Sequence, residues 1–243
     1  MQVYISDNYE EMSALAAGHL NLFMSQSSSP LICVASGDSP AGMYRNLLQG
    51  VQQQNWNAAH WNYVGLDEWI GMNGTDEGSC RYHLNRQLFN PLSVPAEKIC
   101  FFDGRAADPE AECATAESFI SGHRGIDVAV LGLGLNGHIG MNEPGTDPAS
   151  RTHIAELDPL TVQTARKYFE TPREISGGLT LGLGTILESK KIFLLVSGQR
   201  KAAVVKALLE GPVTPALPAS LLQNHPGARL YLDKDAASLL KTN

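Results

Sequence analysis

Short apolar runs alternate along the chain with longer stretches in which apolar residues recur about every third or fourth position. The short runs predict strands, and the longer stretches predict amphipathic helices. Predicted strands cover residues 3–5, 31–35, 63–66, 99–102, 127–131, 192–196 and 230–232. Predicted helices cover residues 9–23, 40–51, 108–121, 159–169, 199–210 and 234–240.

Three of the predicted strands, at residues 31–35, 127–131 and 192–196, are almost entirely apolar. Such strands are typical of the centre of a parallel sheet that helices cover on both faces. The alternation of strands and helices therefore predicts an α/β fold with a doubly wound, mostly parallel sheet. The 243 residues fit one large domain or two small ones, and because no convincing linker divides them we predict a single domain over residues 1–243.

The composition narrows the possible partners. The formal net charge is −7 and no basic cluster stands out, so neither nucleic acid nor an anionic membrane is an expected partner. The first residues lack the pattern of a secretory signal, and no apolar run approaches the length of a membrane span, so we expect a cytoplasmic protein. The four cysteines show no CxxC spacing and the seven histidines no metal-binding spacing, which predicts reduced thiols and no metal site.

Polar clusters follow several of the predicted strands, and ligands bind at the carboxyl ends of strands in a doubly wound sheet. The first cluster is Ser36, Gly37, Asp38 and Ser39, followed by Pro40 at the start of a predicted helix. Free N–H groups at a helix start can bind an anion. An ordinary capped loop explains the same residues equally well, so both interpretations stay open.

The second cluster is Asp67 and Glu68, at the end of the predicted strand 63–66. Neighbouring residues of a strand point to opposite faces, so the two carboxylates should not share one role. One of them can project into a crevice at the strand end and act as a base, while the alternative is a solvated loop or a helix cap.

The third cluster is the glycine-rich segment 132–145, which reads Gly-Leu-Gly-Leu-Asn-Gly-His-Ile-Gly-Met-Asn-Glu-Pro-Gly. Its glycines permit tight turns beside a ligand. His138 is a natural acid and base near neutral pH, and Glu143 is close enough in sequence to orient it. Two cations complete the candidates: Lys167, which sits in a predicted helix, and Lys201, which follows a strand-Ser-Gly turn.

Taken together, these segments resemble the glucosamine-6-phosphate deaminase/isomerase family. The resemblance rests on residues 36–40, 66–69, 132–145, 150–152, 179–182, 197–201 and 218–220, which occur in the family's order over essentially the whole chain. The segment around His138 is the most specific of them, and the others support it.

The resemblance implies a Rossmann-like α/β fold and an amino-sugar phosphate substrate. Asp67 would be the base that moves a proton between C2 and C1, and His138 would catalyse opening of the pyranose ring. Glu143 would tune His138, with Asn136 beside it in the same loop. The reaction would isomerise glucosamine 6-phosphate to the ketose level and release ammonia, giving fructose 6-phosphate. Neither a metal nor an organic cofactor is implied.

The same resemblance implies how the phosphate is bound. The phosphate would lie on the backbone around residues 37–39 and would also be held by two lysines. The substrate-binding residues implied in this way are Ser36, Gly37, Asp38, Ser39, Gly137, Lys167 and Lys201.

Several positions depart from the family pattern. Asn136 stands where some members carry aspartate, so Glu143 is the only carboxylate partner expected for His138 within the loop. Asp38 replaces a small neutral residue, and because a carboxylate facing a phosphate is unfavourable, we expect its side chain to point away. Lys167 replaces a common arginine and offers a point charge instead of a bidentate fork.

Two further departures bear on substrate and assembly. Trp69 and the segment 78–80 resemble the galactosamine-6-phosphate branch of the family. His153 and Ala155 stand where allosteric members carry cations, so we expect a monomer or small homo-oligomer that N-acetylglucosamine 6-phosphate does not activate.

Three other functions remain as alternatives. The first is deamination of galactosamine 6-phosphate to tagatose 6-phosphate. The second is 6-phosphogluconolactonase activity, although that family typically follows the histidine with Thr-Ala-Ser-Leu-Phe-Pro-Gly, where this chain reads Ile-Gly-Met-Asn-Glu-Pro-Gly. The third is sugar-phosphate binding without catalysis, which the presence of Asp67, His138 and Glu143 disfavours.

Overall fold

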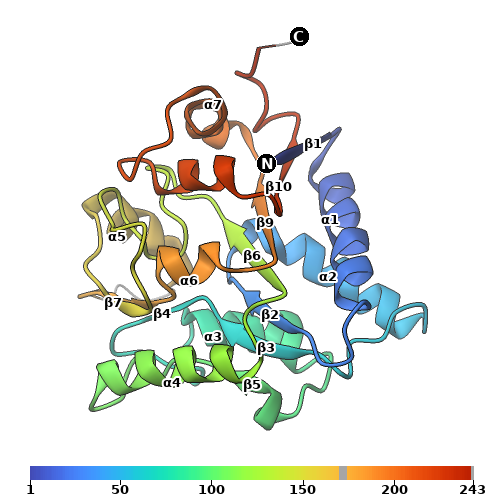
Figure 1. Ribbon diagram of the computed structural model, residues 1–243, viewed down its shortest axis with the longest axis vertical. Coiled ribbons are helices and arrows are strands. Elements are labelled where there is room, and N and C mark those ends of the chain that lie inside the picture. The colour runs from blue at the N-terminus through green and yellow to red at the C-terminus, as the bar shows by residue number, and fades with distance from the viewer. Residues whose placement is uncertain (170–173, 242–243) are drawn as a thin grey trace.

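The computed structural model describes residues 1–169 and 174–241. Its main sheet has seven strands in the order β1-β10-β9-β6-β2-β3-β5, and every neighbouring pair is parallel (Figure 1). The strands are β1 (Gln2–Ser6), β2 (Leu31–Val34), β3 (Asn62–Gly65), β5 (Ile99–Cys100), β6 (Val128–Gly132), β9 (Lys191–Val196) and β10 (Ala228–Asp233). The predicted doubly wound α/β fold is confirmed, and each strand overlaps a predicted one.

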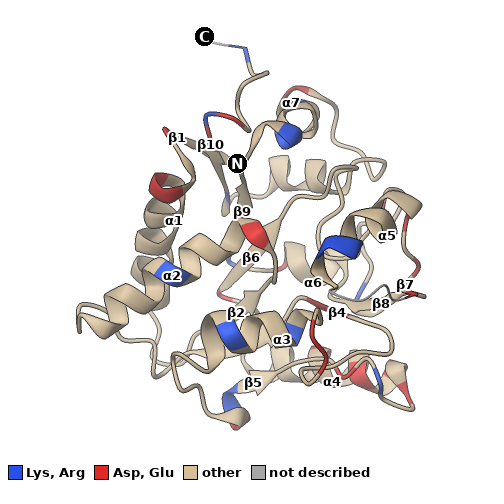
Figure 2. Cartoon of the chain, turned by 180° about the vertical axis from the view of Figure 1, so that it is seen from behind, with Lys and Arg blue, Asp and Glu red and all other residues tan. Residues whose placement is uncertain are grey.

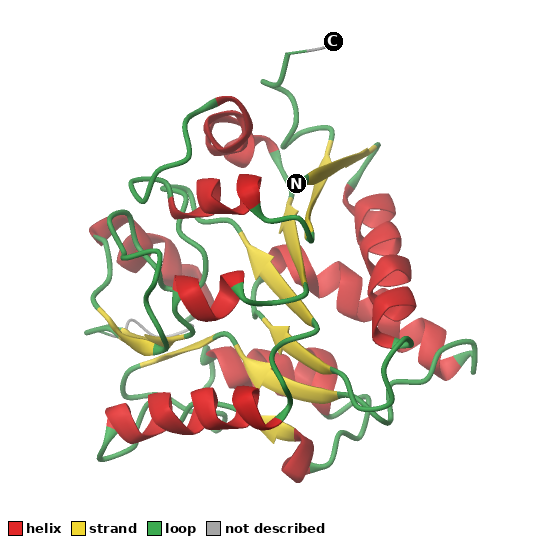
Figure 3. Cartoon of the chain, viewed as in Figure 1, coloured by secondary structure: helices red, strands yellow, loops and turns green. Residues whose placement is uncertain are grey.

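Helices cover both faces of this sheet (Figure 3). One face packs against α1 (Tyr9–Met24), α2 (Asp38–Gln52), the end of α3 (Cys80–Leu84) and the π-helical turn η1 (Asn85–Phe89). The other packs against α4 (Pro109–Gly122), α6 (Leu183–Leu187) and α7 (Ala202–Glu210). Successive strand residues enter opposite cores: Ile32 belongs to the first and Cys33 to the second. This alternation explains why the central strands are apolar throughout.

A second, three-stranded antiparallel sheet was not predicted. It has the order β4-β8-β7, formed by β4 (Asp67–Trp69), β8 (Gly178–Thr180) and β7 (His153–Ala155). Strands of three residues are too short to show a hydrophobic period. Leu66 joins the two sheets, because its N–H donates to Val34 and its carbonyl accepts from Leu181. Asp67 therefore begins β4 where the chain leaves the main sheet.

The helix predicted at residues 234–240 is wrong, because this segment forms a series of turns. The carboxylate of Asp233 accepts hydrogen bonds from the N–H groups of Ala236 and Gly198, which holds the chain in a tight turn after β10. The other predicted helices are present, but two of them begin or end in 3-10 turns, η3 (Arg166–Tyr168) after α5 (Pro159–Ala165) and η4 (Gln199–Lys201) before α7.

The strand order reverses between β2 and β6. After β2 the chain builds β3 and β5 on one side, and after β6 it builds β9 and β10 on the other. The carboxyl ends of β2 and β6 therefore flank a topological switch point, the position at which open α/β sheets bind ligands. No helix among residues 1–169 and 174–241 combines the length and apolar character needed to cross a bilayer.

Candidate active site

The switch point brings together polar segments that are far apart in sequence. The loop after β2 carries Ser36 and leads into α2, and the loop after β6 carries His138. Asp67 begins β4 beside them, close enough to His138 for the charge of the imidazole to act on its carboxyl group. Ser36, Asp67 and His138 thus lie at the carboxyl edge of the sheet.

His138 is held through one ring nitrogen by two side chains. Its Nδ1 lies 3.4 Å from Oε2 of Glu143 and 3.1 Å from Oγ1 of Thr161. The His138 and Glu143 side chains are 18% and 13% exposed, so this contact is partly shielded from water but open to a ligand. Thr161 lies in α5, and a single threonine within a predicted helix gave no signal that could have identified it.

Asn136 supports the carboxylate of Glu143. Its Nδ2 donates to Oε2 of Glu143 at 2.8 Å, and its Oδ1 accepts from the backbone N–H of His138 at 3.2 Å. Burial raises the pKa of Glu143, but hydrogen bonds with His138, Thr161 and Asn136 outweigh burial and bring the pKa below its ordinary value. Glu143 is therefore an ionised partner for His138, and Asn136 fixes its position without adding charge.

Gly134 makes room for the imidazole. A Cβ atom built at this position would lie 2.5 Å from three ring atoms of His138, which is closer than real side chains approach. The backbone at Gly137 adopts a φ of 87°, in the left-handed region that favours glycine. The two glycines allow the loop to turn while the ring of His138 lies against the backbone.

Asp67 and Glu68 point in different directions and have different surroundings. Glu68 is fully buried and accepts hydrogen bonds from the backbone N–H groups of Trp69, Cys80 and Arg81, so it fastens α3 to β4. Asp67 is mostly buried, but part of its surface stays exposed. Burial raises the pKa of Asp67 to about 6, although a hydrogen bond with Cys80 and the charge of His138 lower it. A carboxylate with such a pKa is a stronger base than an ordinary one and is still mostly ionised at neutral pH.

The start of α2 forms the second part of the site. Gly37 is the N-cap residue, with a φ of 114°, and has no side chain that could cap the helix. The N–H groups of Asp38 and Ser39, in the first turn of the helix, therefore have no partner within the helix. Free N–H groups at the start of a helix attract an anion.

Lysines from two other segments converge on this helix start. Lys167 comes from η3, and its Nζ lies 2.5 Å from Oδ2 of Asp38. Lys201 ends η4, and its Nζ donates to the carbonyl of Leu133. Burial lowers the pKa of Lys201 to about 8, and the charges of Lys167 and Arg200 add to this lowering. The site therefore collects positive charge that an anionic ligand would neutralise.

The side chain of Asp38 was expected to point away from the phosphate loop, but it pairs with a lysine that was predicted to hold the phosphate. Its carboxylate is 78% exposed and directed to Lys167, one of the two lysines that were predicted to hold the phosphate. Figure 2 shows the acidic start of α2 and the basic turn after α5 from which these two side chains come.

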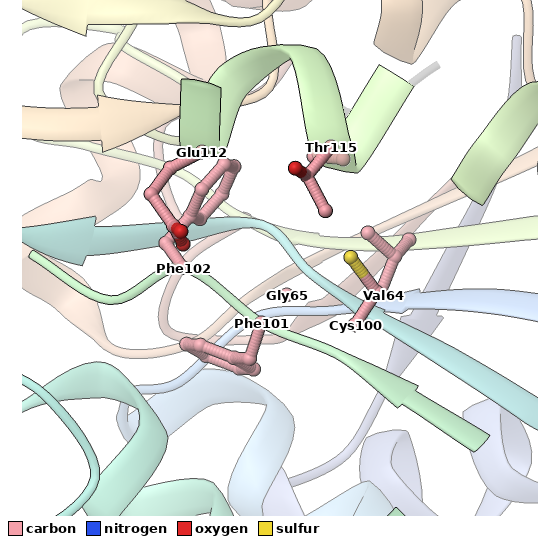
Figure 4. Close-up of a pocket in the computed structure, with 8 residues that line it drawn as sticks. Val64, Gly65, Cys100, Phe101, Phe102, Glu112 and Thr115 are labelled. Carbon is pink, nitrogen blue, oxygen red and sulfur yellow. The ribbon is translucent and has the colours of Figure 1, made fainter. Parts of the chain in front are cut away.

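A small cavity elsewhere does not compete with this site. It holds about 10 Å³ between β3, β5 and α4, and is lined by residues such as Gly65, Phe102 and Glu112 (Figure 4). A space of that size admits at most one water molecule. Within the described residues, no three His, Cys, Asp or Glu side chains gather in a way that could hold a metal ion.

Comparison with known proteins agrees with the geometry. The family model described as glucosamine-6-phosphate isomerases/6-phosphogluconolactonase matches residues 7–231. A glucosamine-6-phosphate deaminase of Clostridium perfringens strain 13 is 36% identical over 242 residues, which is 99% of this chain and 100% of that protein.

Solved structures extend the comparison. A monomeric glucosamine-6-phosphate deaminase superposes with a TM-score of 0.95 at 36% identity, covering 98% of this chain and 100% of the other. The 6-phosphogluconolactonase of Trypanosoma brucei has a TM-score of 0.74 at 20% identity, over 99% and 98% of the two chains, a likeness that shows the fold alone. The chain belongs to the glucosamine-6-phosphate isomerase/6-phosphogluconolactonase family.

Proposed function

We propose that this chain is a glucosamine-6-phosphate deaminase, which converts glucosamine 6-phosphate and water to fructose 6-phosphate and ammonia. The observation that carries the proposal is the convergence of Asp67, His138 and two lysines at the switch point of the sheet. The full-length similarity to proteins named glucosamine-6-phosphate deaminase supports it.

His138 opens the sugar ring in the proposed mechanism. Glu143 and Thr161 both contact Nδ1, so Nε2 is the nitrogen that faces the substrate. Nε2 removes the proton from the O1 hydroxyl and returns a proton to the ring oxygen, which breaks the C1–O5 bond and leaves an aldehyde at C1. The ionised Glu143 stabilises the imidazolium that exists between the two transfers.

Asp67 performs the proton transfer that follows. Its carboxylate removes the proton from C2, and the same proton is delivered to C1. One proton also passes from the amino nitrogen to O1, so that the C1 carbonyl becomes a hydroxymethyl group as C2 is oxidised to an imine. The pKa of about 6 makes this transfer less unfavourable than it would be for an ordinary aspartate. Water adds to C2 and ammonia leaves, which gives the ketose 6-phosphate.

The phosphate orients the sugar without reacting. In the proposal it lies at the start of α2, on the backbone of residues 37–39, and receives hydrogen bonds from Lys167 and Lys201. Binding energy from a remote group of this kind can position the reacting carbons. Ser36 and Gly137 are proposed as further substrate contacts at the ends of β2 and β6.

The test compares three substrates with the purified protein. We expect ammonia and fructose 6-phosphate to appear in equal amounts from glucosamine 6-phosphate, measured by two independent coupled assays. Acid release from 6-phosphogluconolactone without ammonia release would overturn the proposal in favour of lactonase activity. Higher kcat/KM on galactosamine 6-phosphate would assign the galactosamine epimer, which the similarity of Trp69 to that branch keeps as a second candidate.

The proposal also covers the organisation of the protein. Residues 1–243 are proposed to form one catalytic domain, in a cytoplasmic enzyme that acts as a monomer or small homo-oligomer and has no nucleic-acid or membrane partner. The solved relative described as monomeric supports the small assembly. Light scattering of the purified protein at several concentrations tests it, and a stable hexamer would contradict it.

A further inference from the structure

Asp38 is the one carboxylate in the predicted phosphate loop, and it forms an ion pair across 129 residues of sequence. Its Oδ2 lies 2.5 Å from Nζ of Lys167. Both side chains are exposed, Asp38 to 78% and Lys167 to 54%. An ion pair in water of this kind is weak, because solvent and salt compete with each partner. The pair can therefore be exchanged for another anion without disturbing the fold.

The same carboxylate acts on both lysines of the cluster. Burial lowers the pKa of Lys167, but the hydrogen bond with Asp38 and the neighbouring Tyr168 outweigh it, so the pKa lies above its ordinary value. The charge of Asp38 also partly opposes the lowering of the Lys201 pKa. Two lysines and one carboxylate leave the cluster with less net positive charge than the lysines alone would give. An anion bound between the start of α2 and Lys167 would have this carboxylate beside it.

We infer that Asp38 competes with the substrate phosphate for Lys167 and thereby weakens phosphate binding, so that it sets KM and limits inhibition by inorganic phosphate. The inference rests on the proposed function, because it places the substrate phosphate at the start of α2. A sugar phosphate gains further contacts near His138 and Asp67. Inorganic phosphate has only the contacts at the start of α2, where Asp38 competes with it for Lys167. Asp38 consequently favours the complete substrate over the free anion.

The central experiment replaces Asp38 by its neutral isostere. In Asp38→Asn we expect both the KM for glucosamine 6-phosphate and the Ki of inorganic phosphate to fall by about three- to tenfold, as removal of a nearby like charge predicts. The change should fall on these two constants and much less on kcat, because phosphate is held equally in the ground and transition states. The gain should shrink as the salt concentration rises.

A matched control removes the same charge at the opposite edge of the sheet. Asp127 precedes β6, pairs with Lys190 at 2.7 Å and accepts a hydrogen bond from the N–H of Leu31. Asparagine can keep the bond to Leu31, so Asp127→Asn breaks one ion pair and lowers the net negative charge equally. This variant should leave both constants close to those of the wild type. If it lowers them as much as Asp38→Asn does, overall charge and not the local pair sets affinity, and the inference is wrong.

A second variant tests the competition itself. In a Lys167→Met background, Asp38→Asn should give a smaller gain in phosphate affinity, because no partner remains to be released. An equal gain in both backgrounds, or an unchanged or raised Ki in Asp38→Asn, would overturn the inference. Inorganic phosphate binding can be measured by calorimetry without turnover, so a wild-type protein that binds phosphate but releases no ammonia would refute the proposed function and leave this test intact.

Discussion

The two ends of the candidate site contain the same kind of pair in opposite settings. Glu143 lies 3.4 Å from His138, and both side chains are less than one fifth exposed. Asp38 lies 2.5 Å from Lys167, and both are more than half exposed. Asn136 also holds the first carboxylate, whereas an exposed ion pair has little stability of its own. In the proposed mechanism the shielded carboxylate of Glu143 therefore holds its basic partner in place for chemistry, whereas the exposed carboxylate of Asp38 can be replaced on Lys167 by the substrate phosphate.

The largest effect on kcat is expected from Asp67, which belongs to neither pair. Asp67→Asn removes the proposed base and leaves the two pairs in place, so kcat should fall by about a thousandfold while KM changes little. Ammonia release measures kcat, and calorimetry with glucosamine 6-phosphate confirms that binding is retained. Turnover near that of the wild type would show that Asp67 is not the base.

The second largest effect on kcat is expected from the pair of Glu143 and His138. Glu143→Gln keeps the shape of the side chain but removes the charge that stabilises protonated His138, so kcat should fall by about a hundredfold. KM should stay within about twofold, because Glu143 does not contact the phosphate in the proposal. A variant with raised KM and unchanged kcat would place Glu143 in substrate binding. The proposed difference between the Glu143 and Asp38 pairs would then be wrong.

At the phosphate end of the site, we expect substitutions of Lys201 and Lys167 to raise KM by different amounts. Lys201→Met removes a partly buried cation and should raise KM by about tenfold, whereas Lys167→Met should raise it by only about threefold because Asp38 already engages Lys167. In both variants kcat should change much less than KM. The initial rate over a range of substrate concentrations measures both constants. Equal effects of the two substitutions would contradict the proposed difference between them.

The two ends also differ in how far the sequence alone could identify them. His138, Asn136 and Glu143 lie in one glycine-rich segment of eight residues, so their proximity could be predicted from spacing. The contact of Asp38 with Lys167 could not, because it depends on where the fold places η3, which lies between β7 and β8 along the chain. The family resemblance placed both residues at the phosphate, but it did not predict that they pair with each other.

The parts of the fold that were not predicted share a physical cause. The main sheet could be predicted because apolar strands and amphipathic helices carry strong periodic patterns. The strands of the second sheet have three residues each, and Thr161 contacts His138 from a helix in which it looks like any other threonine. Such features depend on tertiary contacts between distant segments, so no local pattern records them.

The smallest expected effect is a pH dependence of phosphate binding, which differs from the pH dependence of kcat. Burial lowers the pKa of Lys201 to about 8, so this lysine loses its charge as the pH rises through that value. Bound phosphate favours the protonated lysine, and the Ki of inorganic phosphate should therefore rise by about fivefold between about pH 7 and pH 9. Inorganic phosphate loses its own second proton near neutral pH, so the Ki is expressed for the dianion at each pH, and the change that remains reports the protein.

A conservative variant tests whether Lys201 causes this dependence of Ki on pH. Lys201→Arg keeps its charge throughout, so the Ki should become nearly independent of pH over the same range. On the acidic side, kcat should fall as the pH drops below about 6, where Asp67 becomes protonated, and this limb should be the same in Lys201→Arg. If the rise in Ki persists in the arginine variant, another group titrates at the phosphate end and Lys201 is not the cation that controls it.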